Sequence, residues 1–337
     1  MAGGGGYIGS VLVNKLLDCG FNVTVIDRFF FGEEILRFNH HANVSLVRQD
    51  IRFLSEADLS DFYAVYDLAA ISNDPSGDID PKITKSINID GRLNLAKCAK
   101  LAGVERYLFF SSCSVYGKSQ SEFSLLDEES DTNPLTVYAE SMLEGESLVI
   151  DLASPDFCVT VLRLGTVFGV SDRMRFDLAV NLMTWSALVN REIIIMGGGN
   201  QCRPFVSVKD VADIACSVMQ YDEKSVICGQ KFNVVHQNYS VFDLAREIAD
   251  CFPGVQLKNA DDQIDERDYR VSSLKLDREL SLRPLTTIKQ GAIEISNDLK
   301  LGVISFSRKS VTVRWYRELL NNPDVYSHLK KDGILLI

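Results

Sequence analysis

The stretch AGGGGYIGSVLVNKLLDCGFNVTVID (2–27) decides the fold. It places Gly3, Gly6 and Gly9 at three-residue spacing ahead of an apolar helical pattern. Glycines let the backbone approach a pyrophosphate closely, and the start of a helix offers free N–H groups with a partial positive charge. The same residues also fit the pattern GxGxxG from Gly4, or could form a flexible leader, so the turn alone is a weak signal for dinucleotide binding.

Asp27 ends the β-rich run that follows this helix, 18 residues after Gly9. In a dinucleotide-binding βαβ unit, an acid at this position accepts hydrogen bonds from the hydroxyls of the adenosine ribose. Because a carboxylate there repels a 2′-phosphate, the spacing favours NAD over NADP, although the adjacent Arg28 keeps NADP open. A turn or helix-cap aspartate is the other interpretation of Asp27.

Short β-rich runs alternate with helical stretches up to about residue 165, as expected for βαβ units. This rhythm predicts an α/β fold: a Rossmann doubly wound parallel sheet that binds ligands beyond the carboxyl ends of its strands. After about residue 170 the rhythm breaks, which predicts a smaller C-terminal α/β substrate lobe. We expect an NAD-binding domain over 1–169, a substrate-binding lobe over 170–325 that is discontinuous with the sheet, and a tail over 326–337; the family resemblance given below implies that this substrate is a nucleotide sugar. The predicted strands are FNVTVID (21–27), VSLVRQD (44–50), AVYDLAA (64–70), RYLFFSS (106–112) and FCVTVLRL (157–164).

Composition and charge exclude several classes of function. The chain has 337 residues, 46% of them hydrophobic, and a net charge of −11, which repels nucleic-acid backbones and anionic membranes. No apolar run approaches the roughly 18 residues of a membrane span, and the N-terminus lacks a signal-peptide pattern. The eight cysteines include no CxxC pair, so we expect reduced thiols, no metal site and a cytoplasmic protein.

A second group of polar residues follows the strand RYLFF. The segment SSCSVYG (111–117) places Ser112 at the strand end, and YAESM (138–142) opens a predicted helix with Tyr138. A hydroxyl at a strand end and a phenol on the following helix together make a proton-transfer pair.

With these motifs, the chain resembles the extended short-chain dehydrogenase/reductases of the nucleotide-sugar epimerase/dehydratase family, from about residue 3 to 320. The resemblance implies NAD as cofactor, Tyr138 as the tyrosine of the YxxxK motif and Ser112 as its partner hydroxyl. It implies four substrate contacts at Ser112, Asn181, Arg203 and Arg267. Ordinary packing or a surface salt bridge is the alternative for each matched position. The implied cofactor-binding residues are Gly3, Gly6, Tyr7, Ile8, Gly9, Asp27, Arg28, Asp50, Ile51, Leu68, Ala69, Ala70, Asn88, Ser111 and Tyr138.

The sequence departs from the family pattern at two places. Met142 stands where the family carries the lysine that lowers the pKa of the tyrosine. An unassisted tyrosine titrates near 10, so about one part in a thousand is phenolate at pH 7, and Met142→Lys is expected to speed turnover. The second departure is at the start, where Met1-Ala2 replace a complete β-strand. A truncated first strand is our interpretation, and a natural fold that tolerates its loss is the alternative.

The family resemblance predicts hydride transfer on a nucleoside-diphosphate sugar, by an epimerase of the 4-epimerase type or a C4 dehydrogenase or reductase. A 4,6-dehydratase ranks lower, because Cys113 and Ser114 replace the Asp-Glu pair of those enzymes. The competing hypothesis is an impaired or engineered-inactive protein that binds NAD and the sugar nucleotide, because of Met142. The resemblance also points to sugars for surface polysaccharides, and to a homodimer through the helices expected over 81–103 and 137–153.

Overall fold

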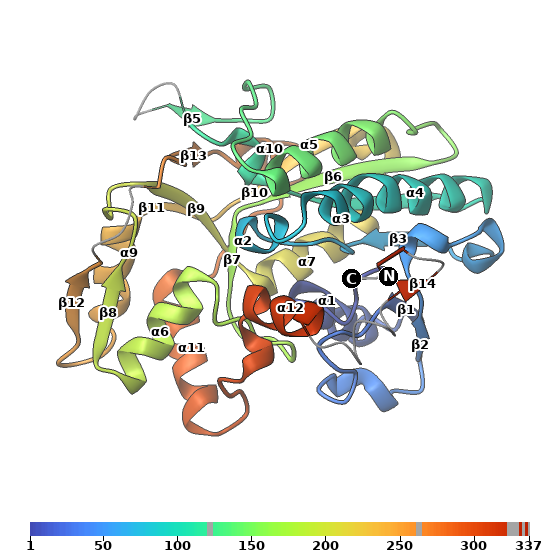
Figure 1. The fold of residues 1–337 in the computed structure, drawn as a ribbon. Helices are drawn as coiled ribbons and strands as arrows, with labels where there is room; N and C mark the ends of the chain where they lie inside the picture. The colour runs from blue at the N-terminus through green and yellow to red at the C-terminus, as the bar shows by residue number, and fades with distance from the viewer. Residues whose placement is uncertain (120–123, 261–264, 322–329, 332–333, 336–337) are drawn as a thin grey trace.

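The structure is a computed structural model that describes residues 1–119, 124–260, 265–321, 330–331 and 334–335. Its main sheet is parallel throughout, in the order β2, β1, Ala2, β3, β4, β6, β10 (Figure 1). The order runs outward in both directions from Ala2, and ligands bind at such a reversal point. The strands are β1 (Val23–Asp27), β2 (Val44–Arg48), β3 (Ala64–Asp67), β4 (Arg106–Ser112), β6 (Cys158–Leu164) and β10 (Gln230–Val234).

The first residues of the chain lie in the middle of this sheet. The N–H of Ala2 donates to the carbonyl of Tyr66 (2.9 Å), and the carbonyl of Ala2 accepts from the N–H of Leu68 (3.0 Å). On the other side, the N–H of Gly3 donates to the carbonyl of Ile26 (2.9 Å). The family resemblance left the central strand in doubt. Ala2 and Gly3 therefore occupy the carboxyl end of the place where that strand would lie.

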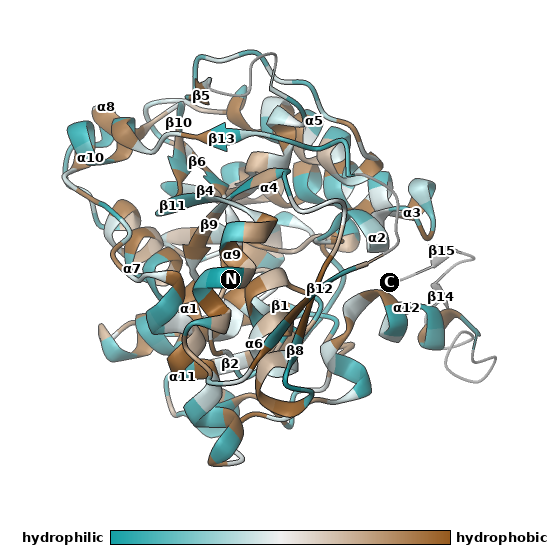
Figure 2. Cartoon of the chain, turned by 90° about the vertical axis from the view of Figure 1, so that its left-hand side faces the viewer, coloured by the Kyte–Doolittle hydropathy of each residue, from teal (hydrophilic) through white to brown (hydrophobic). Residues whose placement is uncertain are grey.

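Helices cover both faces of the sheet. On one face α1 (Tyr7–Asp18) packs against α7 (Val208–Met219), and on the other α4 (Arg92–Leu101) packs against α5 (Val137–Ile150). Every residue of β6 is buried, and so is β4 up to Ser111. This double burial explains why these strands are nearly continuous apolar runs in the sequence. Figure 2 shows the hydrophobic residues gathered on the strands and the inward helix faces. The Rossmann architecture predicted from the sequence is confirmed.

A smaller lobe follows β6. Its apolar core joins Phe168, Val180, Ile193, Leu244 and Ile288. In its sheet β9 pairs parallel with β7 and antiparallel with β11, and β8 pairs separately with β12. The elements of the lobe are β7 (Thr166–Phe168), α6 (Ala179–Val189), β8 (Glu192–Ile195), β9 (Cys202–Ser207), β11 (Gln237–Ser240), α9 (Val241–Ala249), β12 (Gln256–Asn259) and α11 (Ile288–Lys300).

Three segments beyond residue 169 pack onto the first half of the chain. Helix α7 lies on α1, and β10 pairs with β6 in the main sheet. Helix α12 (Thr312–Asn321) places Tyr316 and Leu319 against Ile71 and Ile87. The division at residue 169 stays a prediction, and these contacts show that the later segment also supplies parts of the sheet and its cover. Most of the expected tail over 326–337 lies outside the described residues.

The other elements are short. A π-helix over Ser86–Gly91 joins α3 to α4, and 3-10 turns cover Arg37–His40, Ile51–Phe53, Glu56–Leu59, Cys113–Tyr116 and Arg308–Ser310. The rest are α2 (Asp74–Gly77), α3 (Pro81–Lys85), β5 (Leu125–Leu126), α8 (Lys224–Ile227), β13 (Arg270–Val271), α10 (Leu274–Leu280), β14 (Lys330–Lys331) and β15 (Ile334–Leu335).

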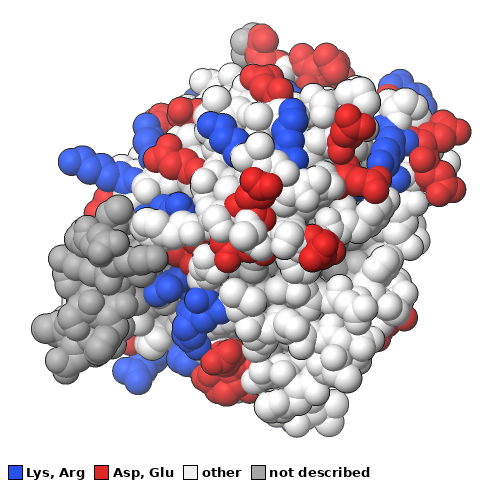
Figure 3. Space-filling view, turned by 90° about the vertical axis from the view of Figure 1, so that its right-hand side faces the viewer, with Lys and Arg blue, Asp and Glu red and all other residues white. Residues whose placement is uncertain are grey.

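The surface carries charges of both signs. On the face drawn in Figure 3, basic and acidic side chains are interspersed over the upper half. Within the described part of the chain, no helix is both long and apolar enough to cross a membrane. In the same residues, no group of three histidine, cysteine or acidic side chains is arranged to hold a metal ion.

Candidate active site

A cleft lies at the carboxyl ends of the main strands, and the glycine turn forms its floor. Gly3 has a φ of +78°, and a Cβ on it would lie 2.7 Å from the backbone nitrogen of Ala69. A Cβ on Gly9 would clash with the carbonyl oxygen of Gly3. Helix α1 begins at Tyr7, and no side chain caps its first turn. The spacing from Gly3 is therefore the pattern that the backbone requires, and the uncapped N–H groups at the start of α1 suit a pyrophosphate.

Asp27 sits at the end of β1, in the wall of the cleft. Its Oδ2 accepts from the N–H of Gly5 (2.9 Å) and its Oδ1 from the N–H of Phe29 (2.8 Å). Burial raises the pKa of this carboxyl, and the backbone hydrogen bonds oppose that shift. Backbone hydrogen bonds thus fix the carboxylate, and its remaining acceptor capacity suits a ribose diol. Arg28 also lines the cleft, with its Cζ 5.6 Å from the ring centroid of Phe30.

The other expected cofactor residues extend this surface, with one exception. Asp50 lines the cleft and is fixed by Arg52, whose Nη2 lies 2.7 Å from its Oδ2. Asn88 is fully buried behind the cleft. Its Oδ1 accepts from the N–H of Ile71 (2.8 Å), and its Nδ2 donates to Ser141 (3.0 Å), so it joins the π-helix to α5. The expected cofactor residues in the lining are Gly3, Gly6, Tyr7, Ile8, Gly9, Asp27, Arg28, Asp50, Ile51, Leu68, Ala69, Ala70, Ser111 and Tyr138.

Tyr138 and Ser112 meet in the same cleft. Helix α5 starts after Thr136, whose hydroxyl accepts from the N–H of Ala139 (3.1 Å), and this cap sets Tyr138 in the first turn. Ser112 ends β4, and its hydroxyl accepts from the N–H of Ser114 (3.1 Å). Burial raises the pKa of Tyr138, whereas its side-chain hydrogen bond with Ser112 lowers it. The structure thus brings the predicted proton-transfer pair together.

Met142 lies one helical turn after Tyr138 and also lines the cleft. Its side chain is buried at 2% exposure. Its sulfur accepts a hydrogen bond from Nη1 of Arg92 (3.5 Å), a fully buried residue of α4. The position that resembles the family's lysine is therefore apolar, but a cation stands directly behind it.

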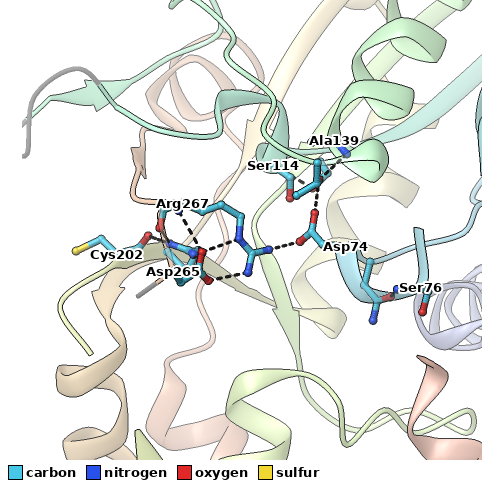
Figure 4. Close-up of polar contacts among 11 residues, drawn as sticks. Asp74, Ser76, Ser114, Ala139, Cys202, Asp265 and Arg267 are labelled. Carbon is cyan, nitrogen blue, oxygen red and sulfur yellow. Dashed lines mark hydrogen bonds and ion pairs between the residues drawn. The ribbon is translucent and has the colours of Figure 1, made fainter. Parts of the chain in front are cut away.

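A chain of polar contacts connects the lobe to α5 (Figure 4). Arg267 pairs with Asp265 (2.6 Å) and with Asp74, which accepts from the hydroxyl of Thr136 (2.5 Å). Arg203 pairs with Asp265 as well (2.8 Å). Neither arginine is in the cleft lining. Arg267 connects the lobe through Asp74 to the start of the helix that carries Tyr138, and Arg203 holds Asp265 within the lobe.

Asn181, expected to contact the substrate, is fully buried below the cleft. Its Oδ1 accepts from the N–H of Gly169 (3.0 Å), and its Nδ2 donates to the Tyr7 hydroxyl (3.1 Å) and to the Arg175 carbonyl (2.8 Å). With these bonds it joins α6 to the start of α1.

Sequence reasoning missed the cleft residues that come from 173–175 and from α12. Arg173 is buried, with its Cζ 3.5 Å from the ring centroid of Phe31, and its Nη2 donates to the Thr312 hydroxyl (2.9 Å). Burial lowers its pKa to about 9, and among the described residues its Nε has no partner. Tyr316 lines the cleft beside it. Two arginines in an otherwise apolar stretch, RMRF (173–176), were the available signal.

Comparisons with known proteins agree with this geometry. The profile of the NAD dependent epimerase/dehydratase family matches residues 1–234. UDP-glucuronic acid decarboxylase 4 of Arabidopsis thaliana is 26% identical over 302 residues, which are 86% of this chain but 66% of that enzyme. A putative UDP-glucose 4-epimerase of Methanocaldococcus jannaschii is 26% identical over 89% of this chain and 97% of its own length.

A solved structure shows the same fold. The UDP-glucuronic acid 4-epimerase of Bacillus cereus, solved with UDP-glucuronic acid and NAD, superposes with a TM-score of 0.76 at 22% identity. The superposition covers 89% of this chain and 98% of that one. Together with the glycine turn, Asp27 and the Tyr138–Ser112 pair, the profile match shows that the chain belongs to the NAD-dependent epimerase/dehydratase family.

Proposed function

We propose that this protein is an NAD-dependent enzyme that transfers hydride to and from C4 of a nucleoside-diphosphate sugar, with 4-epimerisation as its reaction. The observation that carries the proposal is that Tyr138 and Ser112 line the same cleft as the glycine turn and Asp27. A proton acceptor is thereby held next to a dinucleotide site. The relatives named above act on UDP-sugars, which supports a uridine diphosphate sugar as substrate.

Tyr138 and Ser112 have different roles in the proposed reaction. NAD, when bound, accepts the hydride of the sugar carbon and returns it. Tyr138 removes the proton of the sugar hydroxyl as phenolate, while Ser112 donates a hydrogen bond to the same oxygen and steadies it during transfer. Reprotonation of that oxygen by Tyr138 after the hydride returns to the opposite face leaves the epimer. No net oxidation results, and Tyr138 ends as phenolate again.

The cofactor is held by groups of both halves of the chain. Gly3 and Gly9 let the turn pack tightly where a Cβ would clash with backbone atoms, and the uncapped start of α1 leaves N–H groups that suit the pyrophosphate. Arg173 presents a buried guanidinium whose Nε has no partner among the described residues, and an anion can complete its hydrogen bonding. Asp27 suits the ribose diol. These are the residues on which a fit to NAD depends.

A dehydratase is disfavoured by the residues that follow Ser112. Elimination of water needs an acid and a base near C5 and C6 of the sugar. Cys113 is buried, outside the cleft lining, and burial raises the pKa of its thiol far above the ordinary value. Ser114 lines the cleft but its hydroxyl cannot ionise near neutral pH. An epimerase or a C4 dehydrogenase needs neither group.

The test is mass spectrometry of nucleotides released on denaturing the purified protein, followed by turnover of a panel of UDP-, dTDP- and GDP-sugars. We expect NAD or NADH in the extract, and a C4 epimer that keeps its mass among the products. Tyr138→Phe should abolish epimer formation while the cofactor stays bound. A product lighter by one water, or turnover unaffected by Tyr138→Phe, would overturn the proposal.

We also propose a homodimer and a reducing compartment. Helices α4 and α5 lie side by side and expose Leu101 and Leu148, which supports pairing with a second copy through these helices. The described cysteines are all free, and five of them are buried, which suits a reducing environment such as the cytoplasm. Light scattering at micromolar concentration tests the dimer, and a monomeric mass would contradict it.

A further inference from the structure

The contact between Arg92 and Met142 places a positive charge close to the tyrosine of the cleft. Met142 sits between the guanidinium of Arg92 and the cleft that contains Tyr138. We propose that Arg92 is a positioning residue for the reaction, because it supplies from α4 the positive charge that α5 lacks at position 142. This inference rests on the proposed function, since it assigns Tyr138 the role of proton acceptor.

The hydrogen bonds of Arg92 orient its charge. On one edge, Nε donates to Oδ2 of Asp67 (2.9 Å), and Nη2 donates to the carbonyls of Asp67 and Phe110 (2.9 Å each). On the opposite edge, Nη1 has the sulfur of Met142 as its only partner among the described residues. A thioether is a weak acceptor. The edge that is paired with the carboxylate therefore faces Asp67, and the edge without an anionic partner faces Met142 and the cleft.

The surroundings preserve this arrangement. The Cζ of Arg92 lies 3.5 Å from the ring centroid of Phe109, so the guanidinium is stacked and cannot turn toward solvent. Arg92 and Asp67 are both 0% exposed. Because water is excluded, the charge is weakly screened across one side chain. A guanidinium is also protonated at any pH at which the protein folds, so it gives a constant field.

Other groups also act on Tyr138, and the charged ones are held in ion pairs, as Arg92 is with Asp67. Asp74 of α2 raises its pKa and Arg175, before α6, lowers it, each weaker than burial, while Ser112 of β4 lowers it by hydrogen bonding. Asp74 is paired with Arg267, and Arg175 with Asp177. Arg92 lowers the pKa of Tyr138 as well.

The decisive measurement is the pKa of Tyr138 in the full-length protein, from NMR titration of tyrosines labelled at Cζ. The signal is assigned by its loss in Tyr138→Phe. Asp67→Asn removes the carboxylate and leaves the guanidinium uncompensated, so the pKa of Tyr138 should fall. Asp67→Asn/Arg92→Gln removes both charges, so the pKa of Tyr138 should be higher in this double variant than in Asp67→Asn. Met142→Leu is the matched control, and it should leave the pKa unchanged because the cation remains.

The pH profile of turnover should move in parallel with the NMR values. The acid limb of Asp67→Asn should lie at lower pH than that of the wild type. The acid limb of the double variant should lie at higher pH than that of Asp67→Asn, and KM for the sugar nucleotide should be unchanged in both. Arg92→Lys keeps a cation at this position, so its acid limb should lie close to that of the wild type. If Arg92 had only a structural role, its loss would lower activity, but the acid limb would lie at the same pH in Asp67→Asn and in the double variant.

Two results would overturn the inference. The first is an equal pKa of Tyr138 in Asp67→Asn and the double variant. If the double variant does not fold, the second is an unchanged pKa in Asp67→Asn alone. Opposite pKa shifts together with no turnover of any sugar nucleotide would instead refute the proposed function and support the electrostatic role of Arg92. The two failures are thus separable.

Discussion

Met142→Lys tests the surroundings of the active tyrosine through protein stability. The family resemblance alone predicts faster turnover for this variant, but Arg92 changes that expectation, because its Nη1 lies 3.5 Å from the sulfur of Met142. A lysine ammonium in this place would face a buried like charge. At about 4 Å and an effective dielectric constant near 20, two unit charges repel by about 4 kcal/mol, which lowers the pKa of the lysine from about 10.4 to about 7.5.

The sign of the pH dependence follows from that shift. Between about pH 7.5 and 10.4 the unfolded chain binds the lysine proton and the folded protein does not, so the stability of the variant rises with pH. The slope approaches about 1.4 kcal/mol per pH unit, and the loss below pH 7.5 approaches about 4 kcal/mol. A neutral lysine side chain at position 142 also adds no charge beside Tyr138, so turnover at pH 8 or above should stay within a few-fold of wild type.

Urea unfolding of Met142→Lys and Met142→Leu at pH 7, 8 and 9 is the assay. Met142→Leu carries the same loss of the thioether, so the difference in unfolding free energy between the two variants isolates the ammonium. We expect that difference to shrink by about half from pH 7 to pH 9. A difference below about 1 kcal/mol that does not vary with pH would refute the reasoning, and a hundredfold gain in turnover would contradict the compensating role of Arg92.

Three further predictions concern other parts of the site. Asp27→Ala should weaken NAD binding about tenfold to a hundredfold in calorimetry, because a hydrogen bond to a charged acceptor is worth about 1.5–3 kcal/mol; tight NADP binding by the unmutated protein would show that Arg28 dominates. Arg267→Ala should raise KM for the sugar nucleotide. NAD affinity and melting temperature should barely change, because partly exposed ion pairs contribute about 0–1 kcal/mol to stability. An equal loss of NAD affinity would argue against a role of Arg267 in closing the lobe. Glu146→Ala should cost about 3–5 kcal/mol in urea unfolding, because it leaves the guanidinium of Arg163, 2.6 Å away, buried and unpaired; a loss under 1 kcal/mol would contradict this.

The parts of the fold that local patterns encode were predictable from the sequence. The runs 106–112 and 157–164 became β4 and β6 almost residue for residue, because strands buried on both faces must be apolar throughout. The glycine turn was predictable for a similar reason, since only glycine fits at Gly3 and Gly9. Such features leave a local pattern in the sequence, even where the crowding atoms, such as those of Leu68 and Ala69 at Gly3, come from a distant segment.

The parts of the site that depend on distant contacts were not predictable. The approach of Arg92 to Met142 joins two helices across 50 residues of sequence, and no spacing rule encodes it. Asn181 matched a substrate position by resemblance, yet its amide is used between Tyr7 and Gly169. The contribution of α12 to the cleft was missed because its sequence shows amphipathicity but not the surface that it covers.

The place of α12 has a consequence for the order in which the protein becomes functional during synthesis. The indole of Trp315 donates to the carbonyl of Phe30 (2.8 Å), a contact between residues 285 positions apart. At about 5–20 residues per second, roughly 15–60 s pass on the ribosome between making the two partners. The sheet and its glycine turn therefore emerge long before Thr312 and Tyr316 arrive to complete the cleft. Capture of the dinucleotide would then be a late step, and it would stabilise the finished chain in proportion to the logarithm of cofactor concentration.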